Sequence, residues 1–154
     1  MAENNELVQK LIQKEMTIST AESCTGGMIA AAITDVAGAS GVFKEGFVTY
    51  CDEAKNEILG VDAKLLQKYS AVSEQVAEAM ARGVAKKAGA DCAISVTGIA
   101  GPDGGTKDKP VGLVYIGFMV GNTVIVEKHL FDGDRREVRR QAAERAIHGI
   151  LELI

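Results

Sequence analysis

The sequence has little of what several common classes of protein require. It contains no tryptophan, and aromatic residues make up only 5% of its 154 residues, so it offers few side chains on which nucleic-acid bases could stack. Its formal net charge of −4 argues against nonspecific binding to nucleic acid, which needs a basic surface. No apolar run is long enough to cross a bilayer, and the N-terminal "MAENNELVQK" lacks the apolar core of a signal peptide. We therefore expect a cytoplasmic protein with no nucleic-acid or membrane partner.

Cysteine and histidine are also scarce. The three cysteines, Cys24, Cys51 and Cys92, are odd in number and form no CxxC pair, which disfavours a disulfide framework or a zinc site. Reduced thiols are typical of a cytosolic protein. Only His129 and His148 could act as histidine bases.

The pattern of apolar residues predicts one α/β domain over residues 1–154, since helices interleave with strands and a hairpin lies near the end. The predicted architecture is a three-layer α/β/α sandwich with a mixed, mostly parallel sheet. Expected helices cover 5–14, 26–34, 52–59, 63–69, 74–88 and 134–154, and expected strands cover 17–21, 46–51, 91–98, 113–120 and 124–131.

A polar turn between a strand and a helix is the first candidate site. In "STAESCTGGMIAAAI", from Ser19 to Ile33, hydroxyl, thiol and carboxylate side chains precede two glycines and an apolar helix. Such a turn leaves backbone N–H groups at the helix N-terminus free to hold a phosphate or an oxyanion. The same residues would also suit a simple helix cap, and the sequence alone leaves both readings open.

A nucleophilic Ser23 would need a base to accept its proton. His148 falls on the polar face of the last predicted helix and is expected to face solvent. A Ser-His-Asp arrangement is therefore disfavoured, because a suitably placed histidine is lacking. In "VTYCDEAK", Tyr50 ends a predicted strand and Lys55 follows in the first turns of a helix. A buried lysine can act as a base. By spacing alone, however, the favoured interpretation is that Lys55 is a surface residue and Tyr50 a packing residue.

Five of the six arginines lie between Arg135 and Arg145. On an ideal helix Arg135 and Arg139 fall on the side of the apolar residues Val138 and Ala142, where an unpaired guanidinium is costly. Either an acidic side chain or a bound anion such as a phosphate is therefore expected beside them. The other three arginines are expected to be solvated.

The loop "TGIAGPDGG" follows a buried strand, at the position where α/β sheets place ligands. We expect Thr97, Gly98 and Gly101 in this loop to contact a substrate. The alternative is a tolerated surface loop.

Five ordered segments together resemble a known family. "AESCTGG", "VTYCDEAK", "SVTGIAGPDGG", "KPVGLVYIG" and "FDGDRREVRRQAAERAI" look like successive signatures of the C-terminal domain of the competence/damage-inducible protein CinA. The resemblance spans about residues 7–154. Larger members carry an additional N-terminal pyrophosphatase domain, for which we expect no room here. Cys51-Asp52 stands where the family is expected to have a small polar pair.

The resemblance implies hydrolysis of nicotinamide mononucleotide (NMN) to nicotinate mononucleotide and ammonia, in pyridine nucleotide salvage. It implies a serine mechanism without a metal ion or other cofactor, with Ser23 as nucleophile, Lys55 as base and Tyr50 in a proton relay. A homo-oligomer is expected. The residues expected to bind the substrate are Glu22, Thr25, Gly26, Gly27, Thr97, Gly98, Gly101, Arg135 and Arg139.

Within that set, N–H groups around Thr25, Gly26 and Gly27 are expected to stabilise the oxyanion, and Glu22 to orient Lys55 or to cap the turn. Two alternatives stay open. The chain could be a non-catalytic nucleotide-binding or regulatory module, or an amidase that uses the thiol of Cys24.

Overall fold

The computed structural model describes residues 2–154. The helices are α1 (Ala2–Gln13), α2 (Met28–Thr34), α3 (Asp52–Leu59), α4 (Ala63–Tyr69), α5 (Glu74–Ala88) and α6 (Arg135–Leu153), with a short 3-10 helix, η1, at Ala39–Gly41. The strands are β1 (Ile18–Glu22), β2 (Phe43–Val48), β3 (Cys92–Gly98), β4 (Leu113–Val120) and β5 (Thr123–Leu130).

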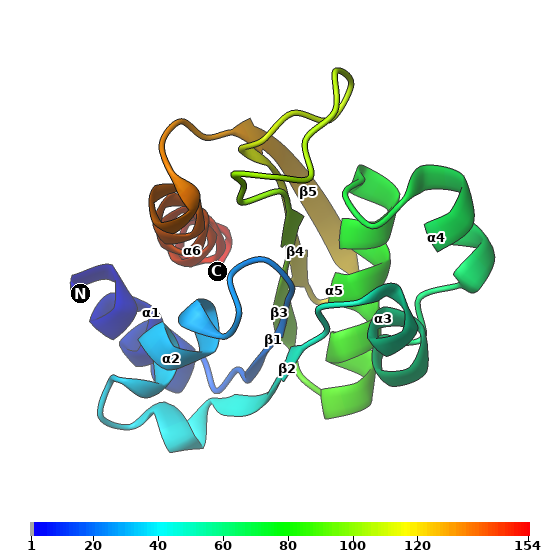
Figure 1. Cartoon of the computed structure of the whole chain (residues 1–154). Helices are drawn as coiled ribbons and strands as arrows, with labels where there is room; N and C mark the ends of the chain where they lie inside the picture. Colours follow the sequence, from blue (N-terminus) through cyan, green and yellow to red (C-terminus); the bar gives the residue numbers. More distant parts are fainter. Residues whose placement is uncertain (1) are drawn as a thin grey trace.

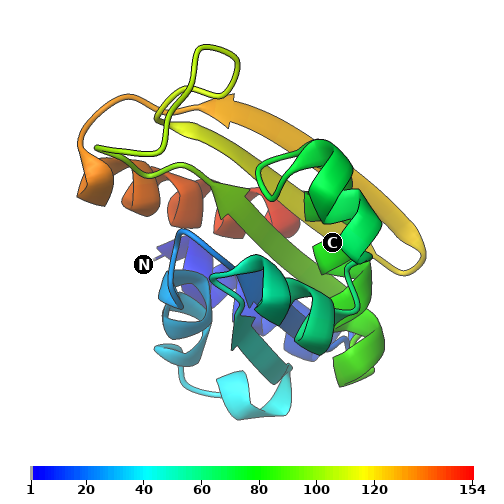
Figure 2. The same cartoon turned by 45° about the vertical axis from the view of Figure 1, so that its right-hand side comes forward.

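The five strands form one mixed sheet in the order β2-β1-β3-β4-β5. Strand β1 is parallel to both β2 and β3, whereas β4 is antiparallel to β3 and β5, so four of the five strands run in one direction. Helices α1, α2 and α6 cover one face and α3, α4 and α5 the other (Figures 1 and 2). The predicted α/β/α sandwich with a mixed sheet is confirmed.

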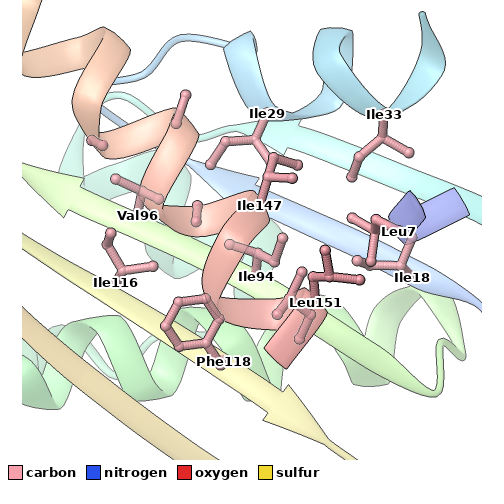
Figure 3. Packing of buried hydrophobic residues seen from close by; sticks show 14 of the residues in the cluster. Leu7, Ile18, Ile29, Ile33, Ile94, Val96, Ile116, Phe118, Ile147 and Leu151 are labelled. Atoms are coloured by element: carbon pink, nitrogen blue, oxygen red, sulfur yellow. The ribbon is translucent and has the colours of Figure 1, made fainter. Parts of the chain in front are cut away.

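Two apolar clusters fill the spaces between the layers. The larger one joins β1, β3 and β4 to α1, α2 and α6, and Figure 3 shows residues of this cluster converging between the sheet and the helices. The smaller cluster joins the other face of the sheet to α3, α4 and α5. Six of the seven residues of the central strand β3 are buried, as expected for a strand covered on both faces.

Most of the predicted elements are confirmed, and β2 is the clearest exception. The strand begins at Phe43 and ends at Val48, whereas the sequence predicted residues 46–51. Gly46 lies inside this strand, and a Cβ there would lie 2.7 Å from Thr20 Oγ1 and 2.8 Å from the Phe43 ring, so the packing against β1 requires glycine. The following segment from Thr49 leaves the sheet and turns toward α3, which brings it to the candidate site.

Candidate active site

The candidate site lies at the carboxyl ends of the three parallel strands, where α/β folds place their ligands. Backbone hydrogen bonds fix the segments that leave these ends: Ser23 N donates to Val96 O (3.0 Å), and Thr49 N donates to Glu22 O (2.9 Å). The turn after β1, the long loop after β3 and the start of α6 gather at this end of the sheet (Figure 1). The topology thus brings together segments that are far apart in the sequence.

Glu22 is the residue that shapes the turn after β1. Its side chain is 1% exposed, and its carboxylate accepts four hydrogen bonds: from Thr25 Oγ1 (2.6 Å), Gly27 N (3.2 Å), Ile29 N (3.0 Å) and Ala30 N (3.0 Å). The carboxylate therefore satisfies the free N–H groups at the start of α2 and complements the helix dipole. The capping role expected of Glu22 is correct. Both oxygens are buried and occupied by these bonds, so the cap rather than the predicted substrate contact accounts for the carboxylate.

This arrangement predicts a large loss of stability in Glu22→Ala. One hydroxyl and three backbone N–H groups would lose a charged acceptor, so the free energy of unfolding should fall by about 3–5 kcal/mol. Urea denaturation measures the loss. Glu45→Ala, at an exposed position of β2, is the matched control and should change stability by less than about 0.5 kcal/mol. Similar effects of the two substitutions would contradict the capping role.

Lys55 lies against Ser23 in the interior. The lysine is 1% exposed, and its Nζ lies 3.1 Å from Ser23 Oγ and 2.8 Å from Thr49 O. No carboxylate forms an ion pair with it within residues 2–154. Burial lowers the pKa of Lys55 from its ordinary 10.5, and the charge of Asp52 opposes this only in part. Lys55 is therefore buried, with a lowered pKa and in direct contact with the hydroxyl.

Tyr50 occupies a different position from the one predicted. Its side chain is 58% exposed, and its hydroxyl accepts a hydrogen bond from Arg135 Nη2 at 2.9 Å. Within the described part of the chain, Tyr50 forms no hydrogen bond with Lys55 or Ser23. Because Lys55 reaches Ser23 directly, the predicted proton relay through Tyr50 is not required, and Tyr50 instead lines the rim of the cavity beside Ser23.

The donors for an oxyanion also differ from the prediction. Gly26 N donates to Ser23 O (3.0 Å) and Gly27 N to Glu22, so neither is free, while Thr25 is completely buried. Neither Cys24 N nor Thr25 N donates to an acceptor among residues 2–154, but Cys24 lines the cavity and Thr25 does not. The sequence analysis missed the Cys24 N–H group. The position of Cys24 directly after Ser23 could have indicated this donor, because in other hydrolases the residue after the nucleophilic serine supplies an oxyanion donor.

The thiol of Cys24 is unsuited to act as the nucleophile. The residue is only 4% exposed, and burial raises the pKa of the thiol to about 11. The thiol is therefore protonated near neutral pH, whereas the reactive form of cysteine is the thiolate. The geometry favours the hydroxyl of Ser23 over its neighbour.

The cavity in front of Ser23 has a volume of about 250 Å³. Thr97, Gly98 and Gly101 line it as predicted, although the Thr97 hydroxyl itself donates to Ala71 O at 2.8 Å. A Cβ at Gly98 would lie 2.7 Å from Val114 Cγ2 and 2.9 Å from Leu113 O, so the close approach of β3 and β4 requires glycine there. The remaining lining comes mainly from Ser23, Lys55, Tyr50, Arg135, residues 71–72 and residues 99–104.

A second cavity of about 710 Å³ lies next to the first and contains three arginines. Arg135, Arg136 and Arg139 line it, and Arg135 lines both cavities. Arg135 is exposed rather than on the buried side of α6, which corrects the helical-wheel prediction. Its Nη1 donates to Gly101 O at 2.7 Å, so it bridges the start of α6 and the long loop. Within residues 2–154, no acidic side chain forms an ion pair with Arg135 or Arg139.

The other titratable groups singled out in the sequence are engaged elsewhere. His129 Nε2 lies 2.8 Å from Glu127, and the ring of His148 lies 2.6 Å from Glu3 and 3.1 Å from Glu152, so His148 is not simply solvated. Two of the three arginines expected to be solvated form surface ion pairs: Arg140 with Glu137 and Glu144, and Arg145 with Glu127 and Glu152.

Residues 2–154 contain no group of three or more His, Cys, Asp or Glu side chains that could hold a metal ion. No helix in that range could span a membrane.

The family model described as the CinA C-terminal domain matches residues 2–154. The chain belongs to the CinA C-terminal domain family. It is 55% identical over 139 residues to a nicotinamide-nucleotide amidohydrolase, PncC, from Enterobacter agglomerans, a match covering 90% of this chain and 85% of that protein. It is also 53% identical over 139 residues to a CinA-like protein from Kosmotoga olearia. That match covers 90% of this chain but only 34% of the relative, so the chain spans about a third of such longer relatives.

Solved structures of the CinA superfamily share the fold over almost the whole chain. A CinA superfamily protein from Escherichia coli superimposes with a TM-score of 0.96 at 38% sequence identity, covering 99% of this chain and 88% of that one. A competence damage-inducible protein A from Klebsiella pneumoniae gives a TM-score of 0.95 at 37% identity, covering 98% and 94%.

Proposed function

We propose that this CinA-family chain hydrolyses the carboxamide of NMN, giving nicotinate mononucleotide and ammonia through a serine–lysine mechanism. The observation that carries the proposal is the 3.1 Å contact between Lys55 Nζ and Ser23 Oγ, made by a lysine that is buried and forms no ion pair within residues 2–154. The name of the PncC relative supports NMN as the substrate. The reaction would act in pyridine nucleotide salvage in the cytoplasm.

In the first half of the reaction, neutral Lys55 accepts the proton of Ser23 while Ser23 Oγ attacks the carboxamide carbon. The carbonyl electrons move to oxygen, and the Cys24 N–H donates to the resulting oxyanion. When the oxyanion collapses, the C–N bond breaks and the Lys55 ammonium gives its proton to the departing NH2, which leaves as ammonia. Thr49 O, 2.8 Å away, holds Nζ in place in both protonation states.

The second half releases the product acid. Water attacks the ester carbon of the acyl-enzyme, and Lys55 takes a proton from that water. The second tetrahedral intermediate then expels Ser23 Oγ, which recovers its proton from Lys55. Nicotinate mononucleotide leaves, and Ser23 and Lys55 return to their starting states without any net change in the enzyme.

Substrate recognition is proposed to depend on Arg135, the arginine that lines both cavities. With the carboxamide at Ser23 in the smaller cavity, the 5′-phosphate extends into the larger one, beside Arg135 and Arg136. Arginine binds phosphate through two parallel hydrogen bonds. Arg135 is thus a better candidate for this contact than Arg139, which has two of its N–H groups engaged by backbone carbonyls.

Arg135→Ala should therefore discriminate between substrates with and without a phosphate. Loss of a charge-assisted contact is worth about 1.5–3 kcal/mol, so kcat/KM for NMN should fall about 10- to 100-fold. The value for nicotinamide riboside, which lacks the phosphate, should change little. Steady-state ammonia release with both substrates measures the effect, and an equal loss on both would mean that Arg135 acts only through its bonds to Gly101 and Tyr50.

The direct test of the proposed activity is incubation of the purified chain with NMN, nicotinamide riboside and free nicotinamide in parallel. We expect ammonia and nicotinate mononucleotide in equal amounts from NMN, and less turnover of the two smaller carboxamides. Saturable binding of NMN without ammonia release would identify a nucleotide-binding module instead.

A further inference from the structure

Arg139 has no acidic partner in the described part of the chain, although its guanidinium is partly buried. Its contacts are with the backbone of the nucleophile turn: Nε donates to Cys24 O at 2.9 Å, and Nη2 donates to Thr25 O at 3.3 Å. Holding a charged side chain away from water costs free energy that two carbonyl bonds offset only in part. A surface arginine placed only for stability, such as Arg140, instead pairs with carboxylates.

The contacts of Arg139 continue through consecutive peptide groups to the oxyanion donor. In a trans peptide the C=O and N–H groups point in opposite directions and move as one rigid unit. The peptide whose C=O is held by Arg139 Nη2 is that of Thr25, and its N–H, on Gly26, donates to Ser23 O at 3.0 Å. The peptide that contains Ser23 O carries the free Cys24 N–H at its other end. Each hydrogen bond in such a chain polarises the next one.

We propose that Arg139 is a positioning residue for catalysis: it orients and polarises the nucleophile turn so that the Cys24 N–H is fixed as the oxyanion donor. A cation at the far end of the chain strengthens the partial positive charge on this N–H group, which Arg139 itself never touches. The inference rests on the proposed serine mechanism, but not on the identity of the substrate.

The packing at Gly26 fits this role. Gly26 has a φ of +60°, and a Cβ there would lie 3.2 Å from Arg139 Nη2. The glycine that gives the turn its left-handed conformation thus also leaves room for the guanidinium to approach the Thr25 carbonyl. The sequence left an acidic side chain and a bound anion open as partners of Arg139, and the structure shows two backbone carbonyls instead. The carbonyl contacts give Arg139 a function without any ligand.

The test uses the Arg139→Ala, Arg139→Lys and Arg139→Met variants, with Arg140→Ala as the matched control one residue away. A fluorophosphonate reagent, which phosphonylates activated serines and releases fluoride, reports on Ser23 and the oxyanion donor without any amide substrate. We expect Arg139→Ala and Arg139→Met to lower the labelling rate of Ser23 and kcat by about 10- to 100-fold, as when an oxyanion donor is impaired. KM should stay within about twofold, and Arg139→Lys should recover part of the loss because its ammonium can still donate to a carbonyl.

The pH profile of labelling separates positioning from structural damage. If Arg139 acts on the donor, the plateau rate falls while the inflection caused by Lys55 stays in place and Arg140→Ala behaves as wild type. A shifted inflection, or unchanged labelling and kcat in Arg139→Ala and Arg139→Met, would overturn the proposal. If the Arg139 variants only raise KM for NMN and leave the kinetics with nicotinamide riboside unchanged, the proposal would be overturned, and Arg139 would instead bind the phosphate. If the wild-type chain is labelled but releases no ammonia from NMN, the proposed substrate fails while the labelling comparison still decides the role of Arg139.

Discussion

Ser23→Ala is expected to lower kcat for NMN by about 10⁴-fold, the scale of loss when the nucleophile of a serine hydrolase is removed. The hydroxyl is the group of Ser23 that is hydrogen-bonded to Lys55, and its removal leaves the backbone bond from Ser23 N to Val96 O intact. The fold should therefore be retained, as circular dichroism and thermal unfolding can establish.

Cys24→Ala is the matched control for this substitution, because it changes the adjacent side chain but leaves the backbone N–H in place. The thiol is buried and protonated near neutral pH, so its loss should lower kcat by less than about tenfold. Activity that survives in Ser23→Ala and disappears in Cys24→Ala would reverse the assignment of the nucleophile.

Lys55→Arg is expected to lower kcat by about 10³-fold, the contribution of a well-placed general base. Arginine keeps the positive charge but cannot lose it in the working pH range, so it cannot accept the proton of Ser23. Because burial lowers the pKa of Lys55, a neutral amine becomes available below the ordinary value of 10.5. The wild-type kcat/KM should therefore rise with pH through this lowered pKa and then reach a plateau.

The same pKa shift makes a prediction about stability that does not depend on any substrate. Between the lowered pKa of folded Lys55 and its ordinary 10.5, unfolding takes up a proton, so the free energy of unfolding should rise with pH across that window. Lys55→Met, which fills the same space without a titratable group, should remove this contribution to the slope and abolish activity. Near-normal kcat in Lys55→Arg, or an unchanged slope in Lys55→Met, would exclude the proposed role of Lys55.

Local signals in the sequence were sufficient for much of the fold. α3, α4 and β4 have the predicted bounds because apolar spacing, strand alternation and local caps all favour the same element. Ser73, a residue type favoured at helix N-caps, caps α5, with its hydroxyl accepting from Val76 N at 3.2 Å. The pairing of Ser23 with Lys55 was predicted from the family resemblance, since spacing alone favoured a surface position for Lys55.

The errors arose where tertiary contacts decide the outcome. A helical wheel places Arg135 with the buried residues of α6, but the first turn of the helix lies beside the long loop, where Arg135 contacts Gly101 and Tyr50 and stays exposed. Glu22 was expected either to orient Lys55 or to cap the turn, and only the structure shows that its carboxylate accepts from N–H groups at the start of the following helix. The position of Cys24 directly after Ser23 was a signal for an oxyanion donor, but only the hydrogen bonds of the turn show that its N–H has no acceptor among residues 2–154.

The most direct test of the central claim is ammonia release from NMN by the wild-type chain, measured before and after complete modification of Ser23 by a fluorophosphonate. The serine–lysine mechanism predicts that the untreated enzyme forms ammonia and nicotinate mononucleotide in a 1:1 ratio, and that release falls in proportion to the fraction of Ser23 modified. An untreated enzyme that releases no ammonia, or release that persists after Ser23 is fully modified, would contradict it.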